Sequence, residues 1–132
     1  MKKTILIVVF GLQIFTWSVG RLAGQDKRVK YLHSPASETG FIGGEAHAYY
    51  SILARRGQKV RIRLRSLRPG ETNGAQFSIS FGKSLRGSKS IDFGKISADG
   101  KTLTGRIPKT GRYFLDITAY PDTHYRLSIT LN

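Results

Sequence analysis

From Phe41 to the end of the chain, apolar and polar residues alternate along short segments. In the clearest segment, residues 59–65, three aliphatic side chains alternate with four basic ones. Such alternation places one set of side chains on the buried face of a β-strand and the other on its solvent face. The same period occurs in residues 46–53, 77–81, 103–107, 113–120 and 124–131.

Turn-forming residues separate these segments. Residues 55–58, 99–100 and 109–111 each contain a glycine, residues 68–74 combine proline with glycine, and the Gly/Ser/Lys-rich stretch 83–90 predicts an irregular connection. No helical period is found in the body of the chain. About seven or eight short strands, with turn signals roughly every 8–12 residues, predict an all-β fold, an antiparallel, jelly-roll-like β-sandwich.

The N-terminus has the order of parts of a secretory signal peptide. Lys2 and Lys3 precede the uncharged stretch 4–20, and Ser18 and Gly20 supply small residues before a cleavage site, with a second candidate site after Gly24. An uncleaved anchor is the alternative, but the stretch is shorter than the roughly 20 residues of a membrane span. The sequence therefore predicts a periplasmic or secreted protein with no membrane span after cleavage.

Three regions follow from this pattern. Residues 1–20 form the signal peptide helix, residues 21–38 a basic flexible arm with a short strand around residues 29–32, and residues 39–132 the β-sandwich. The sandwich is long enough for one hydrophobic core. Since the chain contains no cysteine, no disulfide supports that core.

Charge is the strongest compositional feature. The chain has 22 Lys and Arg against 8 Asp and Glu, and a formal net charge of +14. A field of this sign attracts polyanions or an acidic protein cleft. Alternation places four cations on one strand face, and the last strand adds a fifth to the expected anionic-ligand face. These residues are Lys59, Arg61, Arg63, Arg65 and Arg126. The alternative is a solvated sheet face without a ligand.

Catalytic and metal sites are not expected. The acidic residues fall mostly at turns, no Gly-x-Ser-x-Gly motif occurs, and the three histidines are scattered. We therefore predict no catalytic residue, no metal, no cofactor and no enzymatic activity. An enzyme or an enzyme fragment is the alternative to a binding protein. Tyr49, Phe114 and Tyr120 are expected to face outward and could stack on bases, but export argues against nucleic acid as a partner.

Three segments resemble the bacterial pre-peptidase C-terminal (PPC-like) domains. Residues 49–62 are similar to the family's segment with two aromatic positions followed by Gly-Gln, residues 105–115 to its Pro-x-x-Gly-x-Tyr hairpin, and residues 125–129 to its closing strand. Order and spacing agree over residues 40–132. The resemblance implies a jelly-roll-like β-sandwich.

A free-standing domain with its own signal peptide is most similar to the periplasmic inhibitors of g-type lysozyme, to which residues 39–45 also align. That resemblance implies a non-catalytic protein whose loops plug a lysozyme cleft. The inhibitors carry an arginine-bearing loop between their last two strands, which is shortened here to residues 120–124. The predicted partner-binding residues are Glu45, His47, Tyr49, Tyr120, Asp122 and His124.

The sequence thus predicts an exported, non-catalytic binding protein, an inhibitor of g-type lysozyme or of a similar cell-wall hydrolase. The alternative is a carbohydrate- or anionic-polymer-binding module for envelope glycans such as peptidoglycan or lipopolysaccharide. Nothing in the sequence specifies an oligomeric state.

Export can be tested by expressing the whole chain in a bacterial host and measuring the mass of the periplasmic product. We expect a mature N-terminus at Arg21, or at Gln25 if the second site is used. Retention of residues 1–20 in the membrane fraction would instead support the anchor.

Overall fold

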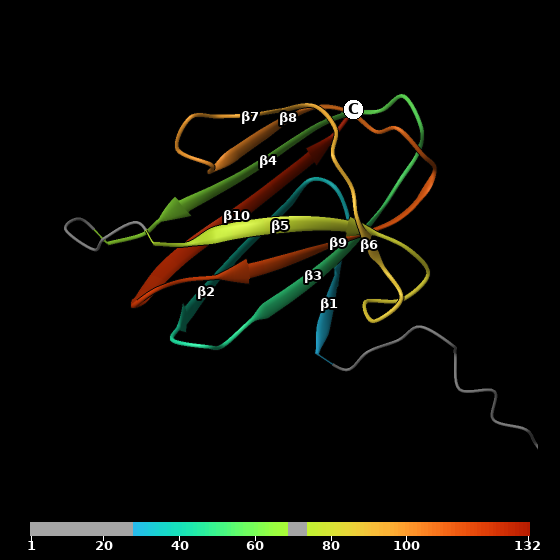
Figure 1. Ribbon diagram of the computed structural model, residues 1–132. Coiled ribbons are helices and arrows are strands. Elements are labelled where there is room, and N and C mark those ends of the chain that lie inside the picture. Colours follow the sequence, from blue (N-terminus) through green and yellow to red (C-terminus); the bar gives the residue numbers. More distant parts are fainter. Residues whose placement is uncertain (1–27, 69–73) are drawn as a thin grey trace, which may run out of the picture.

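The structure, a computed structural model, describes residues 28–68 and 74–132, so the predicted signal peptide lies outside the described residues. Within these ranges the chain forms β-strands joined by turns and loops (Figure 1), and no helix there is long and apolar enough to cross a membrane. The strands are β1 (Val29–Leu32), β2 (Ala36–Gly43), β3 (Ala48–Ala54), β4 (Lys59–Ser66), β5 (Gln76–Phe81), β6 (Lys89–Ser90), β7 (Lys95–Ile96), β8 (Thr102–Arg106), β9 (Gly111–Thr118) and β10 (Asp122–Leu131).

The strands form two sheets that face each other. Sheet A has the order β1-β3-β9-β5-β6, and sheet B has the order β2-β10-β4-β8-β7. All neighbouring strands are antiparallel except β1, which runs parallel to β3. The chain changes sheet at each of its first four connections, so the strands from β1 to β5 lie alternately in the two layers. The all-β sandwich predicted from the alternating segments is confirmed.

The core lies between the sheets and is built by the predicted alternation. In β4, Val60, Ile62 and Leu64 are buried, whereas the four basic residues between them are exposed. β10 lies between β2 and β4 and buries four alternate residues, Thr123, Tyr125, Leu127 and Ile129. Side chains of both sheets join one hydrophobic cluster, so removal of their apolar surface from water drives the sheets together.

One hydrogen bond joins the two sheets inside this core. The hydroxyl groups of Tyr50 on β3 and Tyr125 on β10 lie 2.6 Å apart, and both side chains are buried. Gly40 on β2 makes room for the Tyr125 ring, because a Cβ atom at Gly40 would overlap it. Each buried hydroxyl thus has a polar partner, and burial followed by this hydrogen bond raises the pKa of Tyr125.

The sheets begin earlier than the expected boundary at residue 39. β1 pairs with β3, β2 pairs with β10, and Lys30 Nζ lies 2.6 Å from Glu38 Oε2. Residues 29–32 and 36–38 are therefore paired in sheets, and only residues 21–27 of the expected arm lie outside the described residues. β2 escaped the sequence pattern because its inward positions include Glu38 and Gly40, which give no apolar alternation.

The strand number exceeds the expected seven or eight because β6 and β7 are two-residue strands at the sheet edges. The connection 83–90 contains turns, as expected, but ends in β6.

Phe114 contradicts the expectation of an outward, accessible aromatic, because only 1% of it is exposed. It does lie on the outer side of sheet A, between Ser51 and Ser80 in register. The 82–88 connection reaches that side, where Ser88 Oγ lies 2.7 Å from Ser80 Oγ. A loop fold-back therefore covers this ring, and alternation alone could not indicate it.

The tyrosines of the core predict a loss of stability at high pH. Burial raises the pKa of both Tyr113 and Tyr125, whereas in the unfolded chain tyrosine ionises near pH 10. Above about pH 10 the unfolded state loses protons that the folded state keeps, so the free energy of unfolding should fall as the pH rises. Urea unfolding followed by circular dichroism between about pH 7 and pH 11 measures this slope.

The variant Tyr125→Phe isolates the contribution of the buried pair. It leaves the Tyr50 hydroxyl without its partner, so we expect about 1–3 kcal/mol lower stability at neutral pH and a shallower alkaline decline. The double variant Tyr50→Phe/Tyr125→Phe removes both hydroxyl groups and should regain most of the neutral-pH loss. An unchanged alkaline slope in Tyr125→Phe would contradict this account.

Candidate functional site

The β2–β3 and β9–β10 connections lie at one end of the sandwich, on the left in Figure 1. The described residues 67–68 after β4 and 74–75 before β5 lie at the same end. The amide of Gly44 donates to Pro121 O at 2.7 Å, and the amide of Leu67 donates to His124 O at 2.8 Å. We call this surface the loop end, comprising Phe41, Gly44, Glu45, Leu67 and residues 120–124.

Two glycines let the chain close around the β9–β10 connection. A Cβ atom at Gly43 would overlap Asp122 and Pro121 O, and one at Gly74 would overlap Tyr120 O. Lys101 Nζ donates to Ala75 O, which fixes the chain directly after Gly74. The connection is thus held on two sides by backbone, which limits its conformational freedom before any partner binds.

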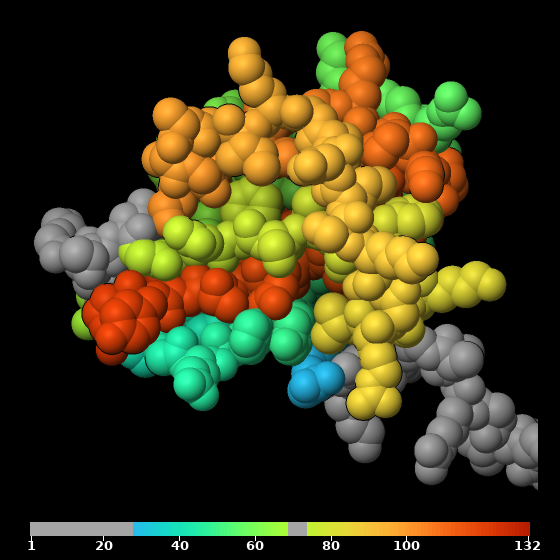
Figure 2. Space-filling model, viewed as in Figure 1, coloured from blue at the N-terminus to red at the C-terminus, as the bar shows by residue number. Residues whose placement is uncertain are grey.

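The loop end exposes large apolar side chains. Tyr120 is 82% exposed, Phe41 59% and Leu67 40%, and these are three of the five exposed large hydrophobic residues in the described ranges. The rings of Phe41 and His124 are in contact, with centroids 4.5 Å apart. Figure 2 shows the orange-red residues around the β9–β10 connection projecting from the left of the molecule. Aromatic residues concentrated on an exposed projection are typical of a protein-binding surface.

The structure divides the six predicted partner-binding residues into two groups. Glu45, Tyr120, Asp122 and His124 lie at the loop end. His47 and Tyr49 instead turn to the outer face of sheet A.

There, His47 Nδ1 lies 2.8 and 3.0 Å from the two carboxylate oxygens of Asp116. The His47 ring stacks on Tyr49 at 5.6 Å, and the Arg28 guanidinium lies 5.5 Å from the Tyr49 ring centre. His47 and Tyr49 are therefore engaged within the domain.

Sequence reasoning missed Phe41 and Leu67. Phe41 precedes buried Ile42 on β2 and therefore faces the outer side of the sheet. Its exposure follows from the alternation once β2 is assigned. Leu67 follows directly after β4, where its contact with the last strand depends on long-range pairing that the sequence does not display.

The five residues of the expected anionic-ligand face lie together on the outer side of sheet B. Lys59, Arg61, Arg63 and Arg65 are the exposed positions of β4, and Arg126 of β10 is opposite Arg65. No described carboxylate forms an ion pair with any of these five residues. In water, unit charges about 7 Å apart repel by roughly 0.6 kcal/mol, so the solvent tolerates this arrangement. We call these five residues the basic face.

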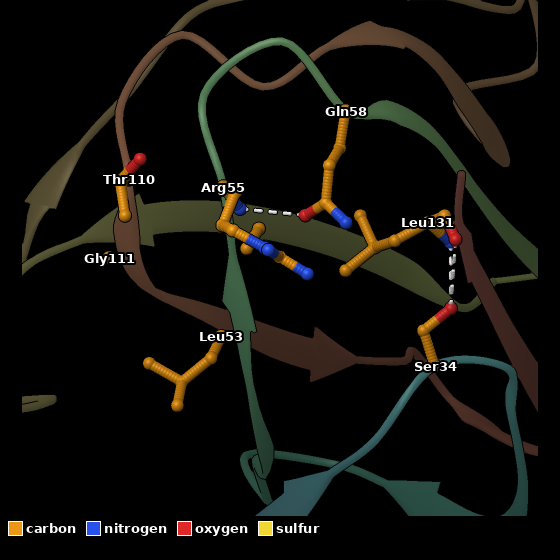
Figure 3. Close-up of a pocket in the computed structure, with 8 residues that line it drawn as sticks. Ser34, Leu53, Arg55, Gln58, Thr110, Gly111 and Leu131 are labelled. Carbon is orange, nitrogen blue, oxygen red and sulfur yellow. Dashed lines mark hydrogen bonds between the residues drawn. The ribbon is translucent and has the colours of Figure 1, made fainter.

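A shallow pocket of about 510 Å³ opens at the opposite end of the sandwich, lined by residues of the β3–β4 and β8–β9 turns, Ser34 and Leu131. Gln58 Oε1 accepts a hydrogen bond from the Arg55 amide, and Ser34 Oγ accepts one from the Leu131 amide (Figure 3). The side-chain oxygens of Gln58 and Ser34 are thus already engaged within the domain.

Within residues 28–68 and 74–132, no three His, Asp or Glu side chains come together as metal ligands would. Lys101 is buried, and desolvation lowers its pKa, but its ammonium group is bound to Ala75 O. The lysine thus has a structural contact that fixes the chain directly before β5.

No protein-family model and no curated protein sequence matches the chain. Its fold is the β-sandwich shared by pre-peptidase C-terminal domains and periplasmic inhibitors of g-type lysozyme, as the sequence resemblance implied.

The chain is similar to the crystal structure of Aeromonas hydrophila PliG, a periplasmic inhibitor of g-type lysozyme, with a TM-score of 0.62 at 16% identity over 79% of this chain and 96% of that one. Salmonella Typhimurium PliG gives a TM-score of 0.55 at 20% identity over 80% and 99% of the two chains. The pre-peptidase C-terminal domain of Bacillus anthracis collagenase gives 0.57 at 16% identity over 81% and 99%.

The glycine contacts at the loop end predict the effect of Gly74→Ala. The added methyl group must displace the Tyr120 backbone, so we expect a loss of about 1–3 kcal/mol in the free energy of unfolding, measured by urea titration. Gly87→Ala is the matched control, because only the movable Ser84 Oγ lies near its added Cβ. Equal stability of the two variants would show that the close approach at Gly74 is not maintained.

Proposed function

We propose that the protein is an exported inhibitor of a g-type lysozyme or of a similar cell-wall hydrolase. The observation that carries this proposal is the loop end, where Tyr120, Phe41 and Leu67 are all exposed at the same end of the sandwich as a constrained connection. Support comes from the fold, because two solved structures of similar fold are described as periplasmic inhibitors of g-type lysozyme. The proposal places the protein in the periplasm or outside the cell.

Tyr120 is the residue best suited to enter a cleft. A glycan-cleaving cleft contains at least one essential carboxyl group, to which a phenolic hydroxyl group can donate a hydrogen bond while the ring fills apolar space. Because Gly43 and Gly74 hold the connection closely, little conformational entropy remains to be lost on binding. A single constrained aromatic residue of this kind can supply much of the binding energy of an interface.

Charged residues of both signs lie at or beside the loop end. Glu45 and Asp122 are exposed at the loop end and would meet like charge in an acidic cleft. Exposed Arg65 and Arg126 lie on the adjoining strands, where they can pair with carboxylates at the rim of such a cleft. In this arrangement Tyr120 enters the cleft and the cations contact the rim of the cleft. The β9–β10 connection itself carries no arginine, which suits this division of roles.

The proposal is tested by titrating the processed chain, purified from a bacterial periplasm, against a g-type lysozyme acting on peptidoglycan. We expect inhibition at a nearly stoichiometric ratio. Tyr120→Ala should weaken inhibition by about tenfold or more, the size expected when an aromatic anchor is removed from an interface centre.

Leu53→Ala is the control, since Leu53 is exposed to the same degree as Phe41 but lies at the opposite end of the sandwich. Circular dichroism of each variant separates a lost contact from a lost fold. Absence of inhibition by the folded parent chain at about tenfold molar excess would refute the proposal, and an equal loss in the two variants would refute the role of the loop end.

A further inference from the structure

The outer side of sheet B carries cations on four neighbouring strands. Besides the basic face, β8 places Arg106 beside Lys59, and β7 places Lys95 beside Thr104. All seven cations are exposed. Along β4 the arginines are about 6.6–6.8 Å apart, so Arg61, Arg63 and Arg65 span roughly 13 Å in a straight line.

The positions between these cations carry hydroxyl groups. Ser128 is opposite Arg63 and Thr130 is opposite Arg61 on β10, while Thr102 and Thr104 occupy the same two levels on β8. β2 continues the pattern with Ser37 beside Ser128. Arg61 and Arg63 therefore each lie in a row of short hydrogen-bonding side chains that leave the guanidinium group accessible.

Two shallow grooves follow this surface. One, of about 210 Å³, is lined by Arg61, Arg63, Arg65, Ser128 and Thr130 between β4 and β10. The other, of about 280 Å³, lies on the β8 side of β4 and shares Arg63 and Arg65 with it. Both grooves are open, and the residues that line them follow β4. Such grooves suit an extended chain better than a compact ligand.

The single carboxylate at these grooves is already engaged. Asp99 lines the second groove, where it accepts hydrogen bonds from Ser97 Oγ at 2.5 Å and from the Lys101 amide at 3.0 Å. The hydrogen bond from Ser97, followed by that from Lys101, lowers the pKa of Asp99. It forms no ion pair with Arg63 or Arg65 among the described residues. The guanidinium groups thus remain available to an anion from outside the chain.

The chemistry of the surface selects among polyanions. Phe41 and His124, at the loop end, are the only aromatic side chains at the outward positions of β2, β4, β8 and β10, so most of the surface offers no ring on which bases could stack. It also offers no large apolar side chain along β4 for insertion into a bilayer. Arginine binds carboxylate, sulfate and phosphate groups in bidentate geometry, and Ser and Thr hydroxyl groups bond to sugar hydroxyl groups.

We propose that the outer side of sheet B binds a linear acidic polysaccharide that lies along β4, with its anionic groups on Arg61, Arg63 and Arg65. The hydroxyl groups of Ser128, Thr130 and Thr104 contact its sugar rings. This surface adjoins the loop end and shares Arg65 with the proposed lysozyme contact, but the polysaccharide contacts of Arg61 and Arg63 do not depend on the inhibition of a lysozyme.

The test uses the processed full chain and two probes, a heparin octasaccharide and alginate oligomers of similar length, with binding measured by calorimetry at several salt concentrations. Arg61→Ser/Arg63→Ser should weaken binding of both probes by about tenfold or more, as expected for the loss of two exposed charged contacts. The parent affinity should fall with added salt, and less steeply in the variant.

Arg55→Ser/Arg56→Ser is the matched control, since it removes the same charge from exposed positions of the β3–β4 turn. It should retain nearly all binding, and Tyr120→Ala should also bind the polysaccharides normally. If Arg61→Ser/Arg63→Ser loses its fold by circular dichroism, Arg65→Ser/Arg126→Ser provides the same comparison on two strands.

Three outcomes would overturn the proposal. Equal weakening by the turn variant would show that net charge alone is responsible. Tighter binding of an oligothymidylate or of anionic phospholipid vesicles than of either polysaccharide would assign the surface to a different class of ligand. Absence of binding by the folded parent chain at low salt would exclude a polyanion site altogether.

Discussion

Face-to-face packing of the two sheets is the constraint on which the rest of the structure depends. With no cysteine in the chain, no disulfide joins the layers, and the hydrophobic cluster between their inner faces is the main contact that holds them together. β4 and β10 contribute every second residue to that core, so their remaining residues must face solvent. The arginines of one outer face therefore lie on the same strands whose other residues build the hydrophobic core. Within that core, the Tyr50–Tyr125 hydrogen bond gives each of the two buried hydroxyl groups a polar partner.

Where one face of a strand is apolar and the other charged, the sequence was sufficient to predict the structure. β4 is the clearest example, because its exposed and buried residues alternate as expected throughout. β2 shows the limit, since its inward Glu38 pairs with Lys30 of the other sheet and its Gly40 makes room for the Tyr125 ring, which is distant in sequence. Phe114 shows a second limit, because burial on an outer face depends on a loop folding back over it.

The candidate site was only partly predictable for a similar reason. Tyr120 was expected to face outward because it follows the outward phase of the alternation in residues 113–120, and it is exposed. Its neighbours Phe41 and Leu67 reach the same end through pairing of β2 and β4 with β10, which a local pattern does not reveal. The placement of His47 on the outer face of sheet A, away from the loop end, also depends on a long-range partner. This partner is Asp116 of β9, the strand next to β3. Sequence periodicity therefore identified the faces of strands, whereas their assembly decided which side chains meet.

The central position of β10 links the two outer surfaces of the molecule. His124 belongs to the loop end, and Arg126, two residues further along the same side of the strand, begins the basic face. At about 6.6–6.8 Å, that separation is shorter than the Debye length of about 8 Å at physiological ionic strength. A negatively charged partner approaching the loop end is consequently drawn in by the field of the basic face before contact. The arginines then act on the association rate as an electrostatic guide, even toward a partner that they do not touch in the final complex.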